Sequence, residues 1–291
     1  AVAWIDTTGA SANVEIKFCG EKVGVKLVNG TFTDGTSEYV SNTEGTKTVA
    51  PNQVIKMLYP KYKCFPTLDV RFTDGNINHS AVSFDFDDLK YNNLENVVEI
   101  FRTESNSHEF SGDISLVIAK MSSSIKYIVC SDSSSKEVYG NIEGISTLEN
   151  LENLHLNDTK VTGNITNLLT NLTKLTSVNF SNTSVEGNIN NAFDGLTALT
   201  HIALLNTQCV GDRFISFRTM VQYNTEAFKS RNDRLSFVVA STSGITDTTT
   251  NTISSLYFDF TGSSTVNVIR SLNSAQIGTY DIDTDTYTAL T

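Results

Sequence analysis

Three consecutive segments decide the fold: LENLENLHLNDTKVTGNI (residues 148–165), LTNLTKLTSVNFSNTSVEGNI (residues 169–189) and FDGLTALTHIALLNTQCVGD (residues 193–212). Each carries spaced leucines or other apolar residues, then threonine, then valine or cysteine, then glycine. The glycines Gly140, Gly163, Gly187 and Gly211 follow one another at intervals of 23, 24 and 24 residues. A fixed period of this length predicts a solenoid, in which no single turn buries its apolar side without its neighbours.

The apolar positions repeat in step from one segment to the next. They are Leu151, Leu154, Leu156 and Val161, then Leu175, Val178, Phe180 and Val185, then Leu199, Ile202, Leu204 and Cys209. The pattern L-x-x-L-x-L-x-x-T-x-V-x-G-N-I resembles leucine-rich repeats, in particular a 24-residue subtype with Gly-x-Ile after the strand. This resemblance implies one short strand per turn in a parallel sheet, a stacked apolar core, and a sharp bend at each glycine.

The ladder position of the repeat departs from the family. Leucine-rich repeats usually carry Asn or Cys there, and this chain carries Thr159, Thr183 and Thr207. A threonine hydroxyl still bonds backbone groups of a turn, so we interpret these three residues as a structural ladder.

Two less regular units precede the three segments. Ile125, Ile128 and Cys130 match the leucines of the first regular unit, with an insertion before the next glycine. Before them, FSGDI (residues 110–114) resembles the Val-x-Gly-Asn-Ile turn and implies a further strand near residues 97–101. We therefore expect about five turns in all.

The flanks predict two smaller β regions. Residues 1–88 alternate apolar and polar residues between turn signals, as in Val14–Ile16–Phe18, and predict an all-β domain. Residues 89–245 hold the solenoid, an amphipathic helix over residues 214–228 and a strand over residues 235–240, before a Ser/Thr-rich loop at residues 241–252. Residues 246–291 predict a C-terminal β unit. The fold class is thus mainly β with some α: a short leucine-rich repeat solenoid flanked by small β domains.

Charge and composition exclude several functional classes. The net charge is −11, and no basic cluster exists to replace counterions on phosphates, so we expect no nucleic-acid partner. No apolar stretch reaches 18 residues, so we expect no membrane insertion. The opening residues AVAWIDTTGA lack the basic and apolar regions of a secretory signal, although a removed signal would leave no trace. The four cysteines match no metal pattern, and we expect buried free thiols, with a Cys19–Cys64 bridge as the alternative.

We find no catalytic, cofactor or metal motif, and predict a protein that is not an enzyme. The sequence lacks GxSxG, a P-loop and a dinucleotide glycine motif. The histidines are His79, His108, His155 and His201, of which the last two fall on repeat strands. We interpret two acidic clusters, Asp85/Asp87/Asp88 and Asp281/Asp283/Asp285, as solvated faces. The alternative interpretation is calcium binding, because alternate aspartates on a strand share one face and resemble half of a calcium site.

The outward positions of the repeat strands form the candidate binding face. They are Glu152, Asn153, His155, Thr176, Ser177, Asn179, Thr200 and His201. Because these side chains are small, polar and almost uncharged, they suit a protein or glycan partner, or a soluble exterior.

Three functional hypotheses follow. The first is a structural or attachment protein in an oligomer or larger assembly, located in a virion. Its modular layout and Ser/Thr/Asn-rich composition resemble virion proteins of tailed phages, including those of gut Bacteroidetes. The second is an extracellular or cell-surface adhesin that binds protein or glycan, and the third is a glycan-active enzyme with accessory repeats.

Overall fold

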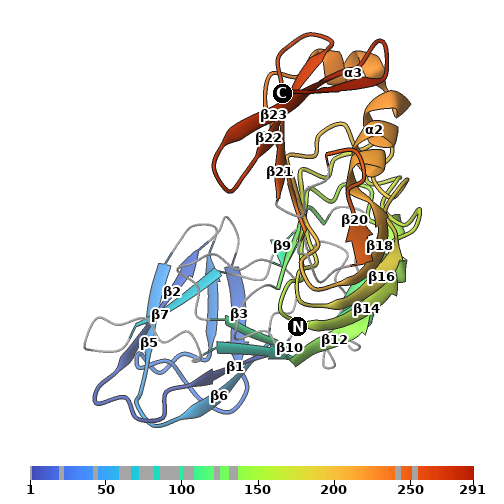
Figure 1. The fold of residues 1–291 in the computed structure, drawn as a ribbon. Helices are drawn as coiled ribbons and strands as arrows, with labels where there is room; N and C mark the ends of the chain where they lie inside the picture. Colours follow the sequence, from blue (N-terminus) through green and yellow to red (C-terminus); the bar gives the residue numbers. More distant parts are fainter. Residues whose placement is uncertain are drawn as a thin grey trace. The chain divides into compact units, whose positions relative to one another are not determined.

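The computed structural model describes residues 2–19, 23–41, 45–58, 67–71, 82–85, 99–100, 108–120, 125–130, 137–239, 244–250 and 255–291. It divides into two compact units, unit 1 (Ala1–Asn141) and unit 2 (Ile142–Thr291). Each unit is mainly β, in agreement with the fold class expected from the sequence (Figure 1).

Unit 1 is a β domain whose main sheet changes from antiparallel to parallel pairing. Its strands are β1 (Val2–Asp6), β2 (Val14–Cys19), β3 (Val23–Leu27), β4 (Glu38–Ser41), β5 (Gly45–Val49), β6 (Val54–Leu58), β7 (Thr67–Arg71), β8 (Val82–Asp85), β9 (Glu99–Ile100), β10 (His108–Asp113), β11 (Tyr127–Val129) and β12 (Glu137–Asn141), with helix α1 (Ile114–Lys120) after β10. Strands β8, β1, β6, β3 and β4 pair antiparallel in that order, and β10 and β12 join β8 in parallel. A smaller sheet has the order β5-β2-β7.

The predicted outlying repeat units are present in unit 1. Strand β9 lies within the expected residues 97–101 and pairs in parallel with β11, with Ile100 opposite Ile128. The segment FSGDI was predicted to be a turn, and this was wrong, because its first residues belong to strand β10. The predicted domain boundary at residue 88 falls between β8 and β10, which pair directly.

Unit 2 contains the regular repeats, and each turn contributes two strands. The first sheet takes β13 (Asn153–His155), β15 (Ser177–Asn179) and β17 (His201–Ala203), followed by β19 (Arg234–Val238). The second sheet takes β14 (Lys160–Asn164), β16 (Ser184–Asn188), β18 (Gln208–Asp212) and β20 (Gly244–Thr246), which lie side by side in Figure 1. A short 3-10 helix, η3 (Glu143–Thr147), precedes them.

The second sheet corrects two predictions. We expected one strand per turn and a bend at each glycine, but Gly163 and Gly187 lie within strands, with φ of 141° and 122°. At Gly187 a Cβ atom would lie 2.5 Å from Oδ1 of Asn164 in the preceding turn, so the glycine permits close approach of successive turns. The Ser/Thr-rich segment predicted as a loop also contributes a strand, β20.

The core is a stack of equivalent side chains along the solenoid. Register places Leu154 beside Val178, Ile202 and Phe237 on the inner side of the first sheet, and all four are fully buried. The second sheet adds Val161, Val185 and Cys209, also fully buried. Cys130 and Cys209 are free, buried thiols as expected, whereas Cys64 and the alternative bridge to Cys19 lie outside the described residues.

The polar residue after the glycine of each turn has a different role in the last turn, where it begins a helix. Oδ1 of Asn164 and of Asn188 each accepts a hydrogen bond from the amide two residues later. The equivalent Asp212 accepts from the amides of Phe214 and Ile215, at 2.9 and 3.0 Å, and so caps helix α2 (Arg213–Tyr223). A carboxylate at this position stabilises a helix N-terminus through both hydrogen bonding and the helix dipole.

The predicted single helix is two helices. Helix α2 ends at Tyr223, and α3 (Thr225–Lys229) follows after Asn224, whose side chain accepts a hydrogen bond from the amide of Ala227 at 3.2 Å. Spacing of apolar residues does not reveal this break, because Asn224 changes the chain direction and caps the second helix.

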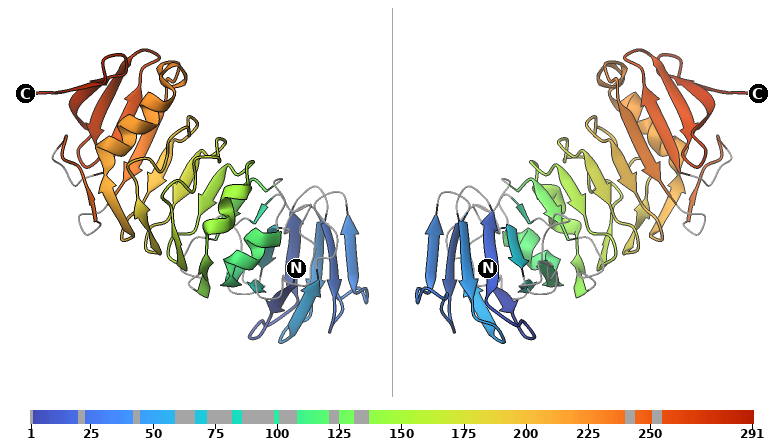
Figure 2. Two further views of the ribbon diagram at one scale, coloured as in Figure 1. Left: turned by 90° about the vertical axis from the view of Figure 1, so that its right-hand side faces the viewer. Right: turned by 90° about the vertical axis from the view of Figure 1, so that its left-hand side faces the viewer.

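The C-terminal strands continue the first sheet rather than forming a separate sheet. Strand β21 (Leu256–Phe260) pairs antiparallel with β19, and β22 (Thr265–Arg270), β23 (Ala275–Asp281) and β24 (Thr286–Ala289) follow in order. Helix α2 packs against their inner side (Figure 2). The rings of Phe217 and Phe258 stack there with centroids 3.8 Å apart. These elements cover the apolar end of the repeat stack.

A buried ion pair lies where the stack ends. The positions of Ile165 and Ile189 are occupied one turn later by Arg213, which is equally buried. Its Nη2 lies 2.9 Å from Oδ2 of Asp247, and the two side chains are 0% and 2% exposed. Asp247 follows β20, so pairing of β20 with β18 brings the compensating charge to the arginine.

We expect Gly187→Ala to lower the free energy of unfolding by about 2–5 kcal/mol, because backbone strain of about 1–2 adds to overpacking of about 1–3. Gly262→Ala is the matched control, since Gly262 has φ of 70° but no other atom within 4 Å of the place that a Cβ would take. Gly262→Ala should lower the free energy of unfolding by the backbone strain alone. Equal losses in urea unfolding of the two variants would contradict close packing between turns.

We expect Asp247→Asn to lower the free energy of unfolding by about 3–5 kcal/mol, because it removes the carboxylate that bonds the buried Arg213 guanidinium and leaves only the charge of Asp212 to stabilise it. The double variant Arg213→Met/Asp247→Leu should recover most of that stability, since apolar groups of similar volume often replace a buried pair without loss. Thermal and urea unfolding measure both. A double variant as unstable as Asp247→Asn would show that the charges themselves are required.

Candidate functional site: the outward face of the first sheet

Two rows of side chains cross the outward face of the first sheet. Register places Asn153, Ser177, His201 and Ser236 side by side, which we name the Ser177 row. The second, the Asn179 row, contains His155, Asn179, Ala203 and Val238. The short strands hold each row at the spacing of paired β-strands, about 4.8 Å per step.

Five of the eight predicted residues lie in these rows: Asn153, His155, Ser177, Asn179 and His201. All five are half-buried. The other three, Glu152, Thr176 and Thr200, directly precede the strands. The Thr176 hydroxyl donates to the Glu152 carbonyl at 3.1 Å, and the Thr200 hydroxyl donates to the Thr176 carbonyl at 3.0 Å. These threonines therefore join successive turns at the margin of the face.

Hydrogen bonds between neighbours fix the polar side chains in place. Nε2 of His155 lies 2.6 Å from Oγ of Ser177 on the next strand. The Thr176 hydroxyl donates to Oδ1 of Asn153 at 2.8 Å, and Oδ1 of Asn179 accepts from the amide of Ser181 at 3.0 Å. Because these side chains are already held in fixed rotamers, they lose little conformational entropy when a ligand binds to them.

The two histidines of the face are neutral at pH 7. Burial lowers the pKa of His155 below its usual 6.5, and the nearby His201 lowers it further. Burial likewise lowers the pKa of His201. The two rows thus carry no formal charge at neutral pH, in a chain whose net charge is −11.

The contact between Ser177 and His155 places a hydroxyl against a neutral imidazole. Nucleophilic catalysis also needs a third group that orients the imidazole, together with donors for an oxyanion. Among the residues that the structure describes, the hydrogen bonds of His155 extend to Ser177 alone, and the titratable group that affects its pKa is another histidine. The chemistry that this geometry offers is hydrogen bonding to a ligand.

The face extends beyond the residues that the sequence indicated. Ser236 continues the Ser177 row on β19, and across the antiparallel strands the row reaches Tyr257 and Ile269. Nη2 of Arg234 lies 2.8 Å from Asp259, and its guanidinium carbon lies 4.5 Å from the centroid of the Tyr257 ring. The alternation in RLSFV and LYFDF was the available signal, but it did not show that these strands share a sheet with the repeats.

The predicted ladder threonines bond within their own turns. The hydroxyls of Thr159, Thr183 and Thr207 donate to the carbonyls of Leu156, Phe180 and Leu204 at 2.6, 2.6 and 3.0 Å. All three threonines are buried. They fix the bend between the two strands of each turn.

The ladder between turns uses the preceding residue, which sequence reasoning missed. Nδ2 of Asn182 donates to Asp158 at 2.7 Å, and Nδ2 of Asn206 donates to Asn182 at 2.8 Å. Asp158, Asn182 and Asn206 adopt φ of 61°, 57° and 51°, a conformation that Asn and Asp tolerate better than most residues. The recurrence of Asp or Asn before each ladder threonine was the signal.

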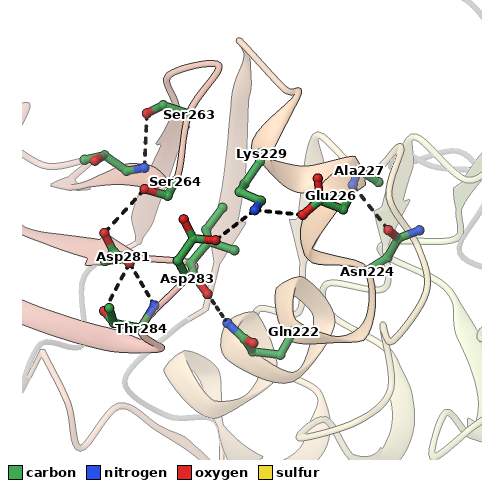
Figure 3. Close-up of polar contacts among 12 residues, drawn as sticks. Gln222, Asn224, Glu226, Ala227, Lys229, Ser263, Ser264, Asp281, Asp283 and Thr284 are labelled. Atoms are coloured by element: carbon green, nitrogen blue, oxygen red, sulfur yellow. Dashed lines mark hydrogen bonds and ion pairs between the residues drawn. The ribbon is translucent and has the colours of Figure 1, made fainter.

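The C-terminal aspartates each have a different partner, and Figure 3 shows those of Asp281 and Asp283. Asp281 accepts from the amide of Thr284 at 2.9 Å, Asp283 pairs with Lys229 of α3 at 2.8 Å, and Asp285 accepts from Nε of Arg218 of α2 at 2.8 Å. Strand β23 ends at Asp281, so the three do not share a strand face. Arg218 lowers the pKa of Asp285. The contacts of Asp283 and Asp285 attach the last hairpin to α3 and α2, whereas that of Asp281 lies within the hairpin.

No group of three or more metal-ligating side chains occurs in the part of the chain that the structure describes. His79, Asp87 and Asp88 lie outside that part, and His108 lies on β10 in unit 1. None of the helices in the described ranges has the length and hydrophobicity that crossing a membrane requires.

Comparison with solved structures finds leucine-rich repeat proteins. The plant peptide hormone receptor RGFR1 in complex with RGF2 matches at 23% identity and a TM-score of 0.37, over 44% of this chain and 19% of that one. The ectodomain of the receptor kinase GASSHO1/SCHENGEN3 from Arabidopsis thaliana matches at 24% identity and a TM-score of 0.34, over 39% and 13%. Internalin C2 from Listeria monocytogenes matches at 19% and 0.35, over 55% and 58%.

The match therefore spans less than two thirds of each of these chains. No protein-family model and no curated protein matches this chain. Assignment of the leucine-rich repeat fold rests on the 24-residue register and the two parallel sheets of unit 2.

We expect acidification from pH 7.5 to 5.5 to destabilise the protein through His155 and His201. Because their pKa values are lowered in the folded state, the unfolded chain binds more protons once the pH falls through about 6.5. The variant His155→Gln/His201→Gln should lose less stability over this interval. Urea unfolding at each pH measures the difference, and identical pH dependence of variant and wild type would contradict it.

The three aspartates with lowered pKa values do not contribute to the change in stability between pH 7.5 and 5.5. The pKa values of Asp212, Asp281 and Asp285 are lowered from 3.8, so their stabilisation is lost only at still lower pH. His79 and His108 are retained in both proteins, so the comparison isolates the two histidines of the face.

Proposed function

We propose that this chain is a non-enzymatic structural or attachment protein that presents the outward face of its repeat sheet to another macromolecule, as a component of a phage virion. The observation that carries the proposal is the pair of uncharged rows across the first sheet, the Ser177 row and the Asn179 row. They combine hydrogen-bonding groups with fixed rotamers on a rigid, laterally paired support.

The electrostatics of the face favour association with a partner. Charged residues are depleted at the centres of protein interfaces, because removing a charge from water is costly. The two rows lack that cost at neutral pH, since both histidines are neutral. The net charge of −11 keeps other surfaces mutually repulsive and the protein soluble.

Absence of catalysis is part of the proposal. The support comes from the contacts of His155, which bonds Ser177 and has no acidic partner among the described residues. A serine without an oriented base and oxyanion donors is a poor nucleophile. The face therefore acts by binding.

The virion location rests on layout and composition. A β unit, a short repeat array and a β cap follow one another in a chain rich in Ser, Thr and Asn. Such a series of β modules suits a component of a larger assembly. The alternative location, a cell surface, makes the same face an adhesin surface for protein or glycan.

An immunological assay separates the two locations. Phage particles and cell envelopes from a culture that expresses the chain are purified by density gradient and probed with an antibody against it. We expect the chain to sediment with particles at a constant ratio to the capsid protein. Recovery in envelopes alone would overturn the virion location and leave the adhesin.

The binding role of the face is tested by charge insertion. Ser177→Arg places a cation at the centre of the Ser177 row, and Thr162→Arg is the control on an exposed position of the second sheet. Binding of each labelled variant to particles or envelopes that lack the chain is measured in competition with wild type. We expect Ser177→Arg to lose about tenfold or more in affinity, about 1.4 kcal/mol, and the control to lose none.

Both variants must unfold at the wild-type temperature for this comparison to apply. A folded Ser177→Arg variant that binds as well as the control would show that another surface makes the contact.

A further inference from the structure

Strand β24 is an edge strand with an open side. It pairs antiparallel with β23, from Asp281 opposite Thr286 to Gly278 opposite Ala289, and no other strand in the described ranges pairs with it. A row of backbone amides and carbonyls on a free edge is a template for a further strand. The question is which strand this edge accepts.

The hydrogen-bonding groups on the open side belong to alternate residues. The Leu290 amide donates to the Ile277 carbonyl at 2.9 Å, so Leu290 directs its backbone groups toward β23. In an antiparallel pair the direction alternates along the strand, so Thr286 and Thr288 also face β23. Tyr287 and Ala289 therefore direct their amides and carbonyls to the open side.

This edge lacks the usual protections against pairing. Sheet edges are commonly blocked by lysine, proline, a bulge or an inward charge. The segment TYTALT (residues 286–291) contains no charged residue and no proline, and its pairing with β23 has no bulge. Thr286, Thr288 and Ala289 are exposed, and Leu290 is 55% exposed.

We propose that β24 pairs antiparallel with β24 of a second copy of this chain, about a two-fold axis at Thr288. This register places Tyr287 opposite Ala289 of the second copy, so the open backbone groups of both residues are satisfied on both molecules. It also places Thr286 opposite Leu290, and Thr288 opposite its own copy, where threonine pairs are favourable.

Charge determines where two copies can approach and in which direction their strands pair. Two molecules of net charge −11 repel over most of their surfaces, so a segment without charge is where they approach at least cost. The aspartates Asp281, Asp283 and Asp285 precede β24. Antiparallel pairing separates the two acidic groups to opposite ends of the new ladder, whereas parallel pairing would bring them together.

Opposite charges at the two-fold axis test the proposal. Thr288→Lys and Thr288→Asp each place two side chains of like charge directly opposite one another in the paired state, with Cβ atoms about 4.5–5.5 Å apart. Molar mass by light scattering over a concentration series should give a mass of two chains for the wild type. Each variant alone should give one chain of 31.8 kDa, and an equimolar mixture of the two should regain the mass of two chains.

Matched controls are Thr162→Lys and Thr162→Asp, which alter an exposed threonine on β14 in the second sheet. They should keep the wild-type mass. All four variants should unfold at the wild-type temperature, because each substituted side chain is exposed. A variant that loses structure is replaced by Ala289→Pro, which removes an amide on the open side.

Three results would overturn the proposal: a wild-type chain of monomeric mass at every concentration, a dimer that persists in both Thr288 variants, or a mixture of the two variants that stays monomeric. The assay uses no partner from particles or envelopes. Failure here would thus leave the proposed function untouched, and failure of the proposed function would leave self-pairing standing.

Discussion

Lateral pairing between turns that are 24 residues apart is the constraint on which unit 2 depends. Each turn places one apolar row on each sheet, and each row is buried only because the next turn covers it. Backbone bonds, glycine contacts and the Asp158–Asn182–Asn206 ladder all repeat at this period. The longer interval from β17 to β19 keeps the same row, with Ile202 beside Phe237, because the extra residues form helices α2 and α3 before β19. The regularity of the sequence is therefore a direct consequence of stacking, and the outward face of the first sheet inherits its spacing from it.

A stack of this kind must end without exposing its apolar rows. In this chain the stack ends where aspartate replaces the asparagine that follows the glycine of each turn. Asparagine in the Gly-Asn-Ile segment closes a local turn, while aspartate at the same place caps helix α2. Arginine then replaces isoleucine, and the segment after β20 supplies its counter-charge. Helices α2 and α3 and strands β21 to β24 cover the end with an aromatic cluster. The same cap prolongs the first sheet, which creates both a longer outward face and the open edge of β24.

The two surfaces that the proposals use differ in chemistry because they differ in position within the sheet. Outward side chains of internal strands have neighbours on both sides, so His155, Ser177 and Asn153 are half-buried and held by one another. Burial also removes the charge of the histidines. The edge strand β24 pairs with a strand on one side only, so the backbone amides and carbonyls on its open side have no strand partner in the described ranges. Its side chains are mostly exposed. The first surface offers fixed side chains for hydrogen bonding, and the second offers free main-chain groups.

The sequence by itself determined the repeat period, the inward residues, the outward positions and the strands of the flanks, because each is a local pattern repeated several times. It placed Asn153, His155, Ser177, Asn179 and His201 at outward positions of the repeat strands, where the structure has them. Tertiary structure alone decided that the glycine segments are strands, since parallel pairing joins residues 22 apart that no local pattern connects. It also decided that the aspartates near residue 283 hold a hairpin to two helices, and that Tyr257 continues the Ser177 row. These depend on which strands become neighbours, and that is set by burial of the whole stack rather than by any one segment.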